Sequence, residues 1–220
     1  MRRIDFEHLD PRHDEVQKRI KLIEKSKGYK VDILDKICTT FTGKTAEIYV
    51  SEGVPIIKSK NITNEGINWD DMEYVIKVFF EGNRNRHLKK NDILINTTGV
   101  GTLGRVALFD KTMPCMTDGH ITTLRINDDV KMLPDYLLYY LRSVWGQTQI
   151  EKYTVGSTGQ TELNDPDLKK IVILYPETIE EQRVMLKAAK EYETLAMNAK
   201  KDYLENLTKS EKEFAKELTE

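Results

Sequence analysis

The sequence predicts an α+β protein, with a mixed, strand-rich domain over residues 1–177 and one long helix of the coiled-coil type over residues 178–220. Short runs rich in Val, Ile, Thr and aromatic residues, each bounded by Gly, Asn, Asp or Pro, are typical of many short strands in a mostly antiparallel sheet or barrel. A few helical patterns interrupt these runs. The final segment contains neither Gly nor Pro, which indicates a helix different in kind from the rest.

The first expected element is a helix over about residues 11–27. Val16, Ile20 and Ile23 recur at helical spacing among charged residues, and Gly28 can end the helix. From Tyr29 onward the period changes. We expect strands in the runs EIYV, VPIIK, EYVIKVFF, DILIN, RVALF and ITTLRI.

A second helix is expected over about residues 134–153. Pro134 fits its first turn, and Leu137, Leu138 and Leu141 form an apolar face. The following stretch, VGSTGQTELNDPD, is dense in Gly, Ser, Thr and Asn and predicts a loop. The run KKIVILYP then predicts a buried strand that ends at Pro176.

The last helix is expected from Thr178 to about Leu218, and Thr178 with Glu181 matches a capping box. A helix of about 40 residues extends about 60 Å at about 1.5 Å per residue, too far to pack wholly on its own small domain. It therefore needs a partner helix, as coiled coils do. The alternative is a solvated charged tail. The side chains expected to line the pairing seam are Leu186, Ala189, Tyr203, Leu207 and Phe214.

The composition limits the possible classes of protein. The 220 residues carry 34 Lys and Arg against 36 Asp and Glu, so the net charge of -2 differs from the strongly basic character of many isolated DNA-binding domains. Only Cys38 and Cys115 are present, so neither a paired-cysteine zinc site nor a disulfide framework is expected. The charged start and the lack of a long apolar run predict a soluble, cytoplasmic protein without a signal peptide.

The segment GVGTLG contains the glycine pattern of dinucleotide-binding sites. Such a site requires a helix directly after the glycines, whereas here the strand-like run RVALF follows. One interpretation is a plain hairpin turn. The other is a loop whose backbone amides approach DNA phosphates, with hydroxyl and guanidinium donors beside them. The candidate residues of this loop are Thr97, Thr98, Gly99, Gly101, Thr102 and Arg105.

The stretch EGNRNRHLKKND is a basic cluster rich in turn-forming residues. A charge run of this kind is often only a solvated loop. In a DNA-binding protein, however, Arg suits the O6 and N7 atoms of guanine, and Asn suits N6 and N7 of adenine. The stretch could then read bases in the major groove through Asn83, Arg84, Asn85, Arg86 and His87, with Lys89 and Lys90 alongside.

Three further groups of polar residues lie elsewhere in the sequence. Lys44, Lys58, Lys60 and Asn61 flank the earlier strands and are candidates for phosphate contacts. Ser157, Thr158 and Gln160 offer small polar groups in the later loop, whose alternative interpretation is an ordinary connection. His8, His13 and His120 are each solitary, so a surface or core role is the default. No catalytic constellation, metal site or cofactor site is expected; Asp118 with Asp129 and Lys131 matches the spacing of metal-dependent nucleases only faintly.

Taken in order, several segments resemble those of the DNA specificity subunits of type I restriction-modification systems. YKVDILDKICTTFTGKT is similar to the family's entry strand and turn, and GVPIIKSKNITNEGIN to its next motif. LKKNDILINTTGVGTLGRVALF resembles its strand, Thr/Gly loop and strand. PDYLLYYLRSVWGQTQI with VGSTGQTELNDPDLKKIVILYP resembles its helix, loop and closing strand, and PETIEEQRVML the start of its long helix. Five degenerate motifs in the right order are more specific than any one alone.

The resemblance implies a target-recognition domain on a long helix, without catalytic activity of its own. It would bind double-stranded DNA and direct an adenine methyltransferase subunit and a restriction subunit to a bipartite site. Full subunits of the family carry two recognition domains and two long helices; this chain has one of each. It resembles a natural half-subunit or a fragment, for which a second copy, paired through the long helix, is the expected substitute. The alternatives are a coiled-coil adaptor that binds protein, and a nuclease.

Overall fold

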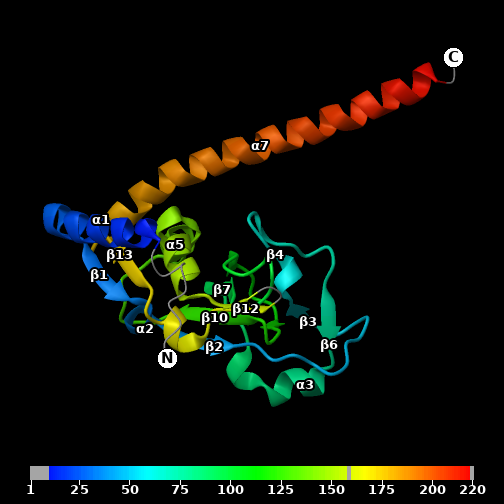
Figure 1. The fold of residues 1–220 in the computed structure, drawn as a ribbon. Helices are drawn as coiled ribbons and strands as arrows, with labels where there is room; N and C mark the ends of the chain where they lie inside the picture. Colours follow the sequence, from blue (N-terminus) through cyan, green and yellow to red (C-terminus); the bar gives the residue numbers. More distant parts are fainter. Residues whose placement is uncertain (1–9, 158–159, 219–220) are drawn as a thin grey trace. The chain divides into compact units, whose positions relative to one another are not determined.

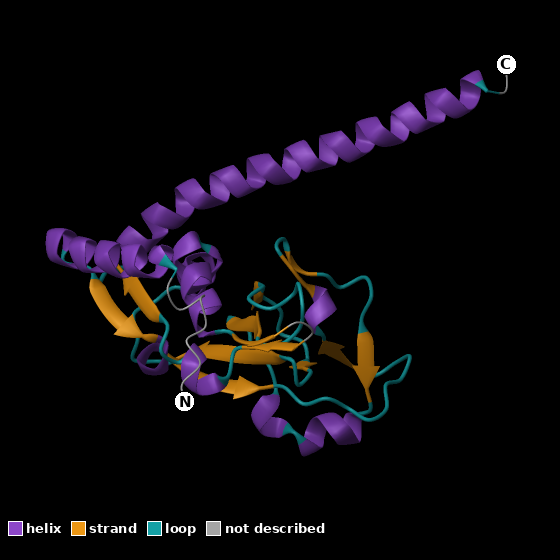
Figure 2. Ribbon diagram, in the orientation of Figure 1, coloured by secondary structure: helices purple, strands orange, loops and turns teal. Residues whose placement is uncertain are grey.

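The structure is a computed structural model that describes residues 10–157 and 160–218. Two compact units make up the chain, Met1–Ile179 and Glu180–Glu220. The first is a mixed domain of short strands and helices, and the second consists of one long helix (Figures 1 and 2). The predicted α+β class is confirmed.

The centre of the first unit is a four-stranded antiparallel sheet with the strand order β2-β10-β7-β8. Every residue of the inner strand β7 is buried. Around this sheet lies an apolar cluster that includes Leu94, Ala107, Phe109 and Ile121, with Trp69 packed against it. The four strands are β2 (Cys38–Thr42), β7 (Asp92–Asn96), β8 (Val106–Phe109) and β10 (Ile121–Ile126).

A smaller sheet and a hairpin flank the central sheet on the side where β3 and β6 lie in Figure 1. In the sheet, β3 pairs antiparallel with β6 and parallel with β9, so the prediction of mostly antiparallel pairing holds with one exception. Ile56, Val75 and Met116 form a second core cluster with Ala46. The strands are β3 (Val54–Ile57), β6 (Glu73–Val75) and β9 (Met116–Thr117); the hairpin is β4 (Ile62–Thr63) with β5 (Gly66–Ile67).

On the other side of the central sheet, α1 (Pro11–Lys27) lies near the antiparallel pair β1 (Lys30–Ile33) and β13 (Val172–Tyr175), as Figure 1 shows. Asp10 caps α1 by accepting a hydrogen bond from the Arg12 amide, and Gly28 ends it in the left-handed conformation. The predictions of this helix and of the closing strand are confirmed. The short helix α2 (Leu34–Ile37) connects β1 to β2.

Two predicted strands are wrong in part. EIYV forms no strand, and only Val50 makes an isolated bridge, to Tyr74. In EYVIKVFF the strand β6 ends at Val75, and α3 (Lys77–Gly82) follows. Its Phe79 and Phe80 pack against the second core cluster, so tertiary packing outweighs the strand preference of these residues.

The predicted helix over residues 134–153 is two helices, α4 (Pro134–Arg142) and α5 (Val144–Tyr153). At the break, the Ser143 hydroxyl donates to the Tyr140 carbonyl at 2.6 Å and accepts a bond from the Gly146 amide, capping α5. The predicted loop that follows contains three short elements instead: β11 (Val155–Ser157), β12 (Gln160–Glu162) and α6 (Asp165–Leu168).

The second unit contains α7 (Ile179–Glu217), an unbroken helix of 39 residues that confirms the predicted long helix (Figure 2). Its buried residues are Gln182 and Leu186, whereas Tyr203, Leu207 and Phe214 are exposed. Of the helices described, none combines the length and apolar character that a membrane span requires.

A buried ion pair holds one end of β7. The carboxylate of Asp92, only 2% exposed, accepts hydrogen bonds from Nε and Nη2 of Arg125 at 2.8 and 2.6 Å. It also accepts the Lys89 amide at 2.7 Å, while Arg125 donates to the His87 carbonyl at 3.0 Å. One pair therefore joins β7 and β10 to the basic segment that precedes β7.

Replacing Arg125 with Met should destabilise the fold, because it leaves the Asp92 carboxylate buried without its main donor. Since Arg125 is partly exposed, we expect a loss of about 2–4 kcal/mol in the free energy of unfolding, at the lower end of what breaking a buried pair costs. Urea denaturation measures this. Arg19→Met is the matched control, because its exposed pair with Glu15 contributes about 0.5 kcal/mol or less. Equal effects of the two substitutions would contradict the assignment.

Candidate nucleic-acid interface

The Thr/Gly loop of residues 97–105 is the turn between β7 and β8, so its glycines are followed by a strand, as the sequence predicts, and not by the helix of a dinucleotide-binding site; a phosphate contact at this turn stays a prediction. Asn96, fully buried at the end of β7, closes this turn: its side-chain amide donates to the carbonyls of Ser59 and Thr102 at 3.0 and 3.1 Å. Gly101 and Gly104 adopt positive φ angles of 76° and 81°, which favour glycine. The Asn96 side chain therefore fixes the conformation of the loop at its base.

The later hairpin of β11 and β12 lies against the Thr/Gly loop, although some 60 residues separate them in the sequence. Thr98 forms a bridge with Glu162, and the Gly99 amide donates to the Thr161 carbonyl at 3.3 Å. The Leu163 amide donates to the Thr97 carbonyl at 2.8 Å. Two segments that the sequence offered as separate candidates are thus joined by backbone hydrogen bonds.

His120 belongs to the same surface, and the sequence analysis missed it. Its Nδ1 lies 2.6 Å from the Thr98 hydroxyl, and its carbonyl accepts the Thr97 amide at 3.0 Å. Its own amide donates to Asp118, whose pKa is raised because the carboxyl is buried. A solitary histidine carries no signal in the sequence; only the pairing of β10 with β7 brings it to Thr98.

Lys44 lies beside the turn of residues 117–120, which carries His120 and is called the His120 turn below. Its amide donates to the Thr117 carbonyl at 3.0 Å, while the hydroxyl of Thr45 accepts the Gly119 amide at 3.2 Å. The approach requires Gly43, since a β-carbon there would lie 2.1 Å from the Asp118 carbonyl oxygen. The exposed side chain of Lys44 is thus fixed at its base next to residues 117–120.

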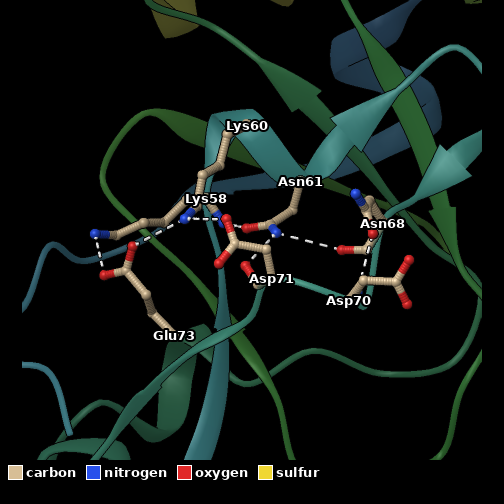
Figure 3. A network of polar contacts seen from close by, with 7 residues as sticks. All are labelled: Lys58, Lys60, Asn61, Asn68, Asp70, Asp71 and Glu73. Carbon is tan, nitrogen blue, oxygen red and sulfur yellow. Dashed lines mark hydrogen bonds and ion pairs between the residues drawn. The ribbon is translucent and has the colours of Figure 1, made fainter. Parts of the chain in front are cut away.

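The predicted candidates Lys58, Lys60 and Asn61 are engaged within the chain. Asn61 is buried, and its side chain accepts the Lys58 amide and donates to the carbonyls of Asn68 and Asp71. The two lysines form ion pairs with Asp71 and Glu73 (Figure 3). Arg105 similarly donates to the Gly101 carbonyl at 2.9 Å and reaches that of Ile62 at 3.5 Å.

The basic stretch before β7 divides into braced and exposed residues. Arg86 donates to the carbonyls of Thr42 and Gly43, and His87 stacks on Phe80 with ring centroids 3.5 Å apart. The Asn83 side chain donates to a carbonyl of α3. Of the candidate residues in the stretch, Arg84, Asn85, Lys89 and Lys90 are exposed.

The remaining candidates are placed as follows. Gly101 is exposed, and Thr102 is half-buried within the turn. Thr158 lies outside the described residues. For Ser157 and Gln160 the structure gives only their backbone pairing across the hairpin of β11 and β12. On α7, Leu186 is buried and Ala189 half-buried.

The joined loops offer hydrogen-bonding groups, namely Thr hydroxyls, an imidazole and the backbone amides of a glycine turn, with the exposed Lys44 beside them. The exposed residues Arg84, Asn85, Lys89 and Lys90 belong to the stretch that precedes the other end of β7. Among the described residues no group of three or more His, Cys, Asp or Glu is placed to hold a metal ion. Burial raises the pKa of both Cys38 and Cys115 to about 12, which makes their thiols poor nucleophiles.

A family model for the type I restriction modification DNA specificity domain matches residues 28–208. Because the match covers most of the chain, this protein belongs to that family. A curated relative, the putative type I restriction enzyme MjaX specificity subunit of Methanocaldococcus jannaschii, is 29% identical over 190 residues, or 85% of this chain and 43% of that protein.

Solved structures share the fold. The type I S subunit from M. genitalium matches with a TM-score of 0.54 and 19% identity over 76% of this chain and 39% of that one. The HsdS subunit from Thermoanaerobacter tengcongensis matches with a TM-score of 0.52 and 16% identity, over 83% and 45% of the two chains. The chain thus spans less than half the length of these relatives.

Gly104→Ala should loosen the Thr/Gly turn. A β-carbon there would lie 3.1 Å from Oε1 of Gln147 and 3.3 Å from Ile150, at a φ of 81°. Because an L-residue is strained in this conformation, we expect a loss of about 1–2 kcal/mol in unfolding free energy. The control Gly82→Ala, at an open helical position, should stabilise by roughly 0.4–1 kcal/mol. Urea denaturation measures the unfolding free energy of both variants. Equal unfolding free energies of Gly104→Ala and Gly82→Ala would contradict the geometry.

Proposed function

We propose that this chain binds a specific short DNA sequence and directs partner methyltransferase and restriction subunits to it, without catalytic activity of its own. The observation that carries the proposal is the convergence of the Thr/Gly loop, the hairpin of residues 155–162 and the His120 turn at one end of the central sheet. Loops held by a rigid sheet are a common platform for recognition. Membership in the specificity family supports the same conclusion.

Base recognition is assigned to side chains that are exposed and have hydrogen-bonding capacity left. Arg84 and Asn85 stand next to each other and suit guanine and adenine edges in the major groove. Thr98 and His120 form a donor and acceptor pair on the joined loops. The candidates Ser157, Thr158 and Gln160 are assigned to base contacts from the sequence alone.

Phosphate contacts are assigned to the long cationic side chains and to backbone groups. Lys44, Lys89 and Lys90 are exposed, and the turn at Gly99 and Gly101 lets the backbone approach a phosphate closely. With a net charge of -2 the chain supplies few such contacts. Because phosphate contacts dominate affinity, the partner subunits would provide the rest by enclosing the duplex.

The proposal extends to a homodimer through α7, whose exposed apolar side chains recur at helical spacing. Antiparallel pairing about Asn198 gives layers that match large side chains with smaller or charged ones. Ala189 would face the partner's Leu207, Glu193 the partner's Tyr203, and Ala196 the partner's Lys200. Each recognition domain, joined to its helix at Ile179, would then sit at an opposite end of the pair. The DNA target would be two inverted, identical half-sites.

A coiled-coil adaptor that binds protein through its strand-rich domain is the second candidate, favoured by the length and exposed apolar stripe of α7. Salt separates the two functions. Binding to DNA weakens steeply as salt rises, because counterions are released from the duplex. Binding at an apolar protein surface does not.

Arg84→Ala should weaken binding to a duplex selected by the wild-type protein from a randomised pool. If Arg84 makes a bidentate guanine contact, the loss is about 1–3 kcal/mol and discrimination falls at one base position. Fluorescence anisotropy on the selected duplex and on its single-base variants measures both quantities.

Arg86 is the matched control within the same stretch. Since its guanidinium donates to the carbonyls of Thr42 and Gly43, Arg86→Ala should instead lower the unfolding free energy by about 1–3 kcal/mol. Lys90→Ala should weaken binding evenly across sequences and reduce the salt slope by about 1. Unchanged affinity in both Arg84→Ala and Lys90→Ala would remove this stretch from the interface.

The dimer is tested with Tyr203→Asp combined with Leu207→Asp. Light scattering should find a dimer for the wild type at tens of micromolar and a monomer for the variant, because two buried charges would face the opposing helix. A wild type that stays monomeric, with or without a methyltransferase partner, contradicts this part of the proposal.

The register is tested by cysteine cross-linking. In the pairing about Asn198, Met197 lies at the two-fold axis near its own copy, so Met197→Cys should form a disulfide between chains on oxidation. The natural Cys38 and Cys115 are buried and do not compete. Asn198→Cys is the control, at the same height but on the outer face of the helix, and should not cross-link. Cross-linking of both, or of neither, argues against this register.

A further inference from the structure

The amine of Lys60 lies between two carboxylates. Its Nζ is 2.8 Å from Oδ2 of Asp71 and 3.3 Å from Oε1 of Glu73 (Figure 3). The hydrogen bond with Asp71 is the main reason why the pKa of Lys60 is raised. The side chains of Lys60 and Asp71 are 46% and 75% exposed. Exposed pairs of this kind are weak and exchange readily with other ions.

Lys58 differs from Lys60 in being fixed. Its Nζ lies 2.5 Å from Oε2 of Glu73 and 3.7 Å from the ring centre of Tyr49, and its side chain is only 23% exposed. Burial disfavours its charge, but the bond with Glu73 and the neighbouring Tyr49 outweigh this, and the pKa of Lys58 is raised. Glu73 therefore forms a short, half-buried ion pair with Lys58 and a longer one with Lys60.

The backbone that carries Asp71 is held in place by hydrogen bonds. The buried Asn61 amide donates to the Asp71 carbonyl at 3.0 Å and to the Asn68 carbonyl at 3.3 Å, while its oxygen accepts the Lys58 amide at 2.9 Å. The Asp70 amide donates to the Asn68 side chain at 2.9 Å. This network, drawn in Figure 3, fixes residues 68–71 beside the lysines.

Lys60 also lies next to the proposed DNA surface. It belongs to the short 3-10 helix η2 (Ser59–Asn61), and the Ser59 carbonyl accepts the Asn96 side chain that closes the Thr/Gly turn. The carbonyl of Ile62, the residue directly after η2, lies 3.5 Å from the Arg105 guanidinium of that turn. Asp71 and Glu73 thus neutralise Lys60 next to the Thr/Gly loop.

We propose that Asp71 and Glu73 determine specificity by masking Lys60, so that it contacts a DNA phosphate only when base contacts seat the duplex. This inference rests on the proposed function. Nonspecific binding comes almost entirely from cations that displace counterions. A masked lysine must first leave its carboxylates, which also repel the phosphate. Nonspecific duplexes are therefore bound less well. At a specific site, the free energy of the base contacts offsets the cost of moving Lys60 from its carboxylates to a phosphate.

The test uses Asp71→Asn, which keeps the backbone carbonyl that Asn61 requires. We measure binding of the full chain to a nonspecific duplex from about 50 to about 200 mM salt. Because Glu73 still lies 3.3 Å from Lys60 in this variant, releasing the lysine from Asp71 should steepen the slope of log K against log salt by up to about 0.9. The gain in affinity over the wild type should then shrink by up to roughly 3.5-fold across this range. The ratio of specific to nonspecific affinity should fall.

Lys60→Ala shows whether the gain comes from this lysine. In the wild-type background it should change nonspecific affinity little, and in the Asp71→Asn background it should abolish the gain. Glu15→Gln is the matched control, an equal loss of charge at the exposed Arg19 pair of α1. A gain that persists without Lys60, or that Glu15→Gln reproduces, overturns the inference as a general charge effect.

The outcomes also separate this inference from the proposed function. If the wild type binds its selected duplex and Asp71→Asn leaves both affinities unchanged, masking is wrong and DNA recognition stands. If neither the wild type nor the variant binds any duplex at low salt, the proposed function is wrong, and the masking role with it.

Discussion

The buried strand β7 is the element on which the rest of the structure depends, because a buried polar side chain lies at each of its two ends. Asp92 and Asn96 are both buried, and a buried polar group is costly unless it is hydrogen-bonded. Asp92 meets this requirement through Arg125 and Lys89. The side-chain NH2 group of Asn96 meets it through the carbonyls of Ser59 and Thr102, whereas the Oδ1 atom of Asn96 has no hydrogen-bond partner. The two residues thereby tie the basic stretch to one end of the strand and the Thr/Gly turn to the other.

This arrangement explains how short, irregular segments can form a defined surface. The loops contribute few apolar contacts of their own, so their shape depends on backbone bonds to one another and to the sheet. The bonds of Thr97 and Gly99 to residues 161–163, and of Thr98 to His120, bring together segments from three parts of the chain. Side chains positioned this way lose little further conformational freedom on binding, which favours affinity and selectivity together.

Several cationic side chains near the loops interact with carboxylates or carbonyls of the same chain. Lys58 and Lys60 have carboxylates within ion-pair distance, and Arg86 and Arg105 donate to backbone carbonyls. A sequence-based assignment treats every lysine and arginine near a loop as available to a phosphate. The structure leaves a smaller exposed set, including Lys44, Arg84, Lys89 and Lys90. A modest exposed charge suits the proposed recognition function, since strong nonspecific attraction would compete with sequence selection.

The sequence by itself determined the α+β class, the helix Pro11–Lys27, the strand that ends before Pro176 and the long C-terminal helix, because hydrophobic period, caps and chain breakers are local signals. Tertiary structure alone decided the helix in EYVIKVFF, the break at Ser143 and the hairpin of residues 155–162. It also decided that His120 contacts Thr98 and that Lys60 forms ion pairs with Asp71 and Glu73. These features depend on contacts between residues distant in the chain, and no local pattern encodes which partner a buried or charged group will meet.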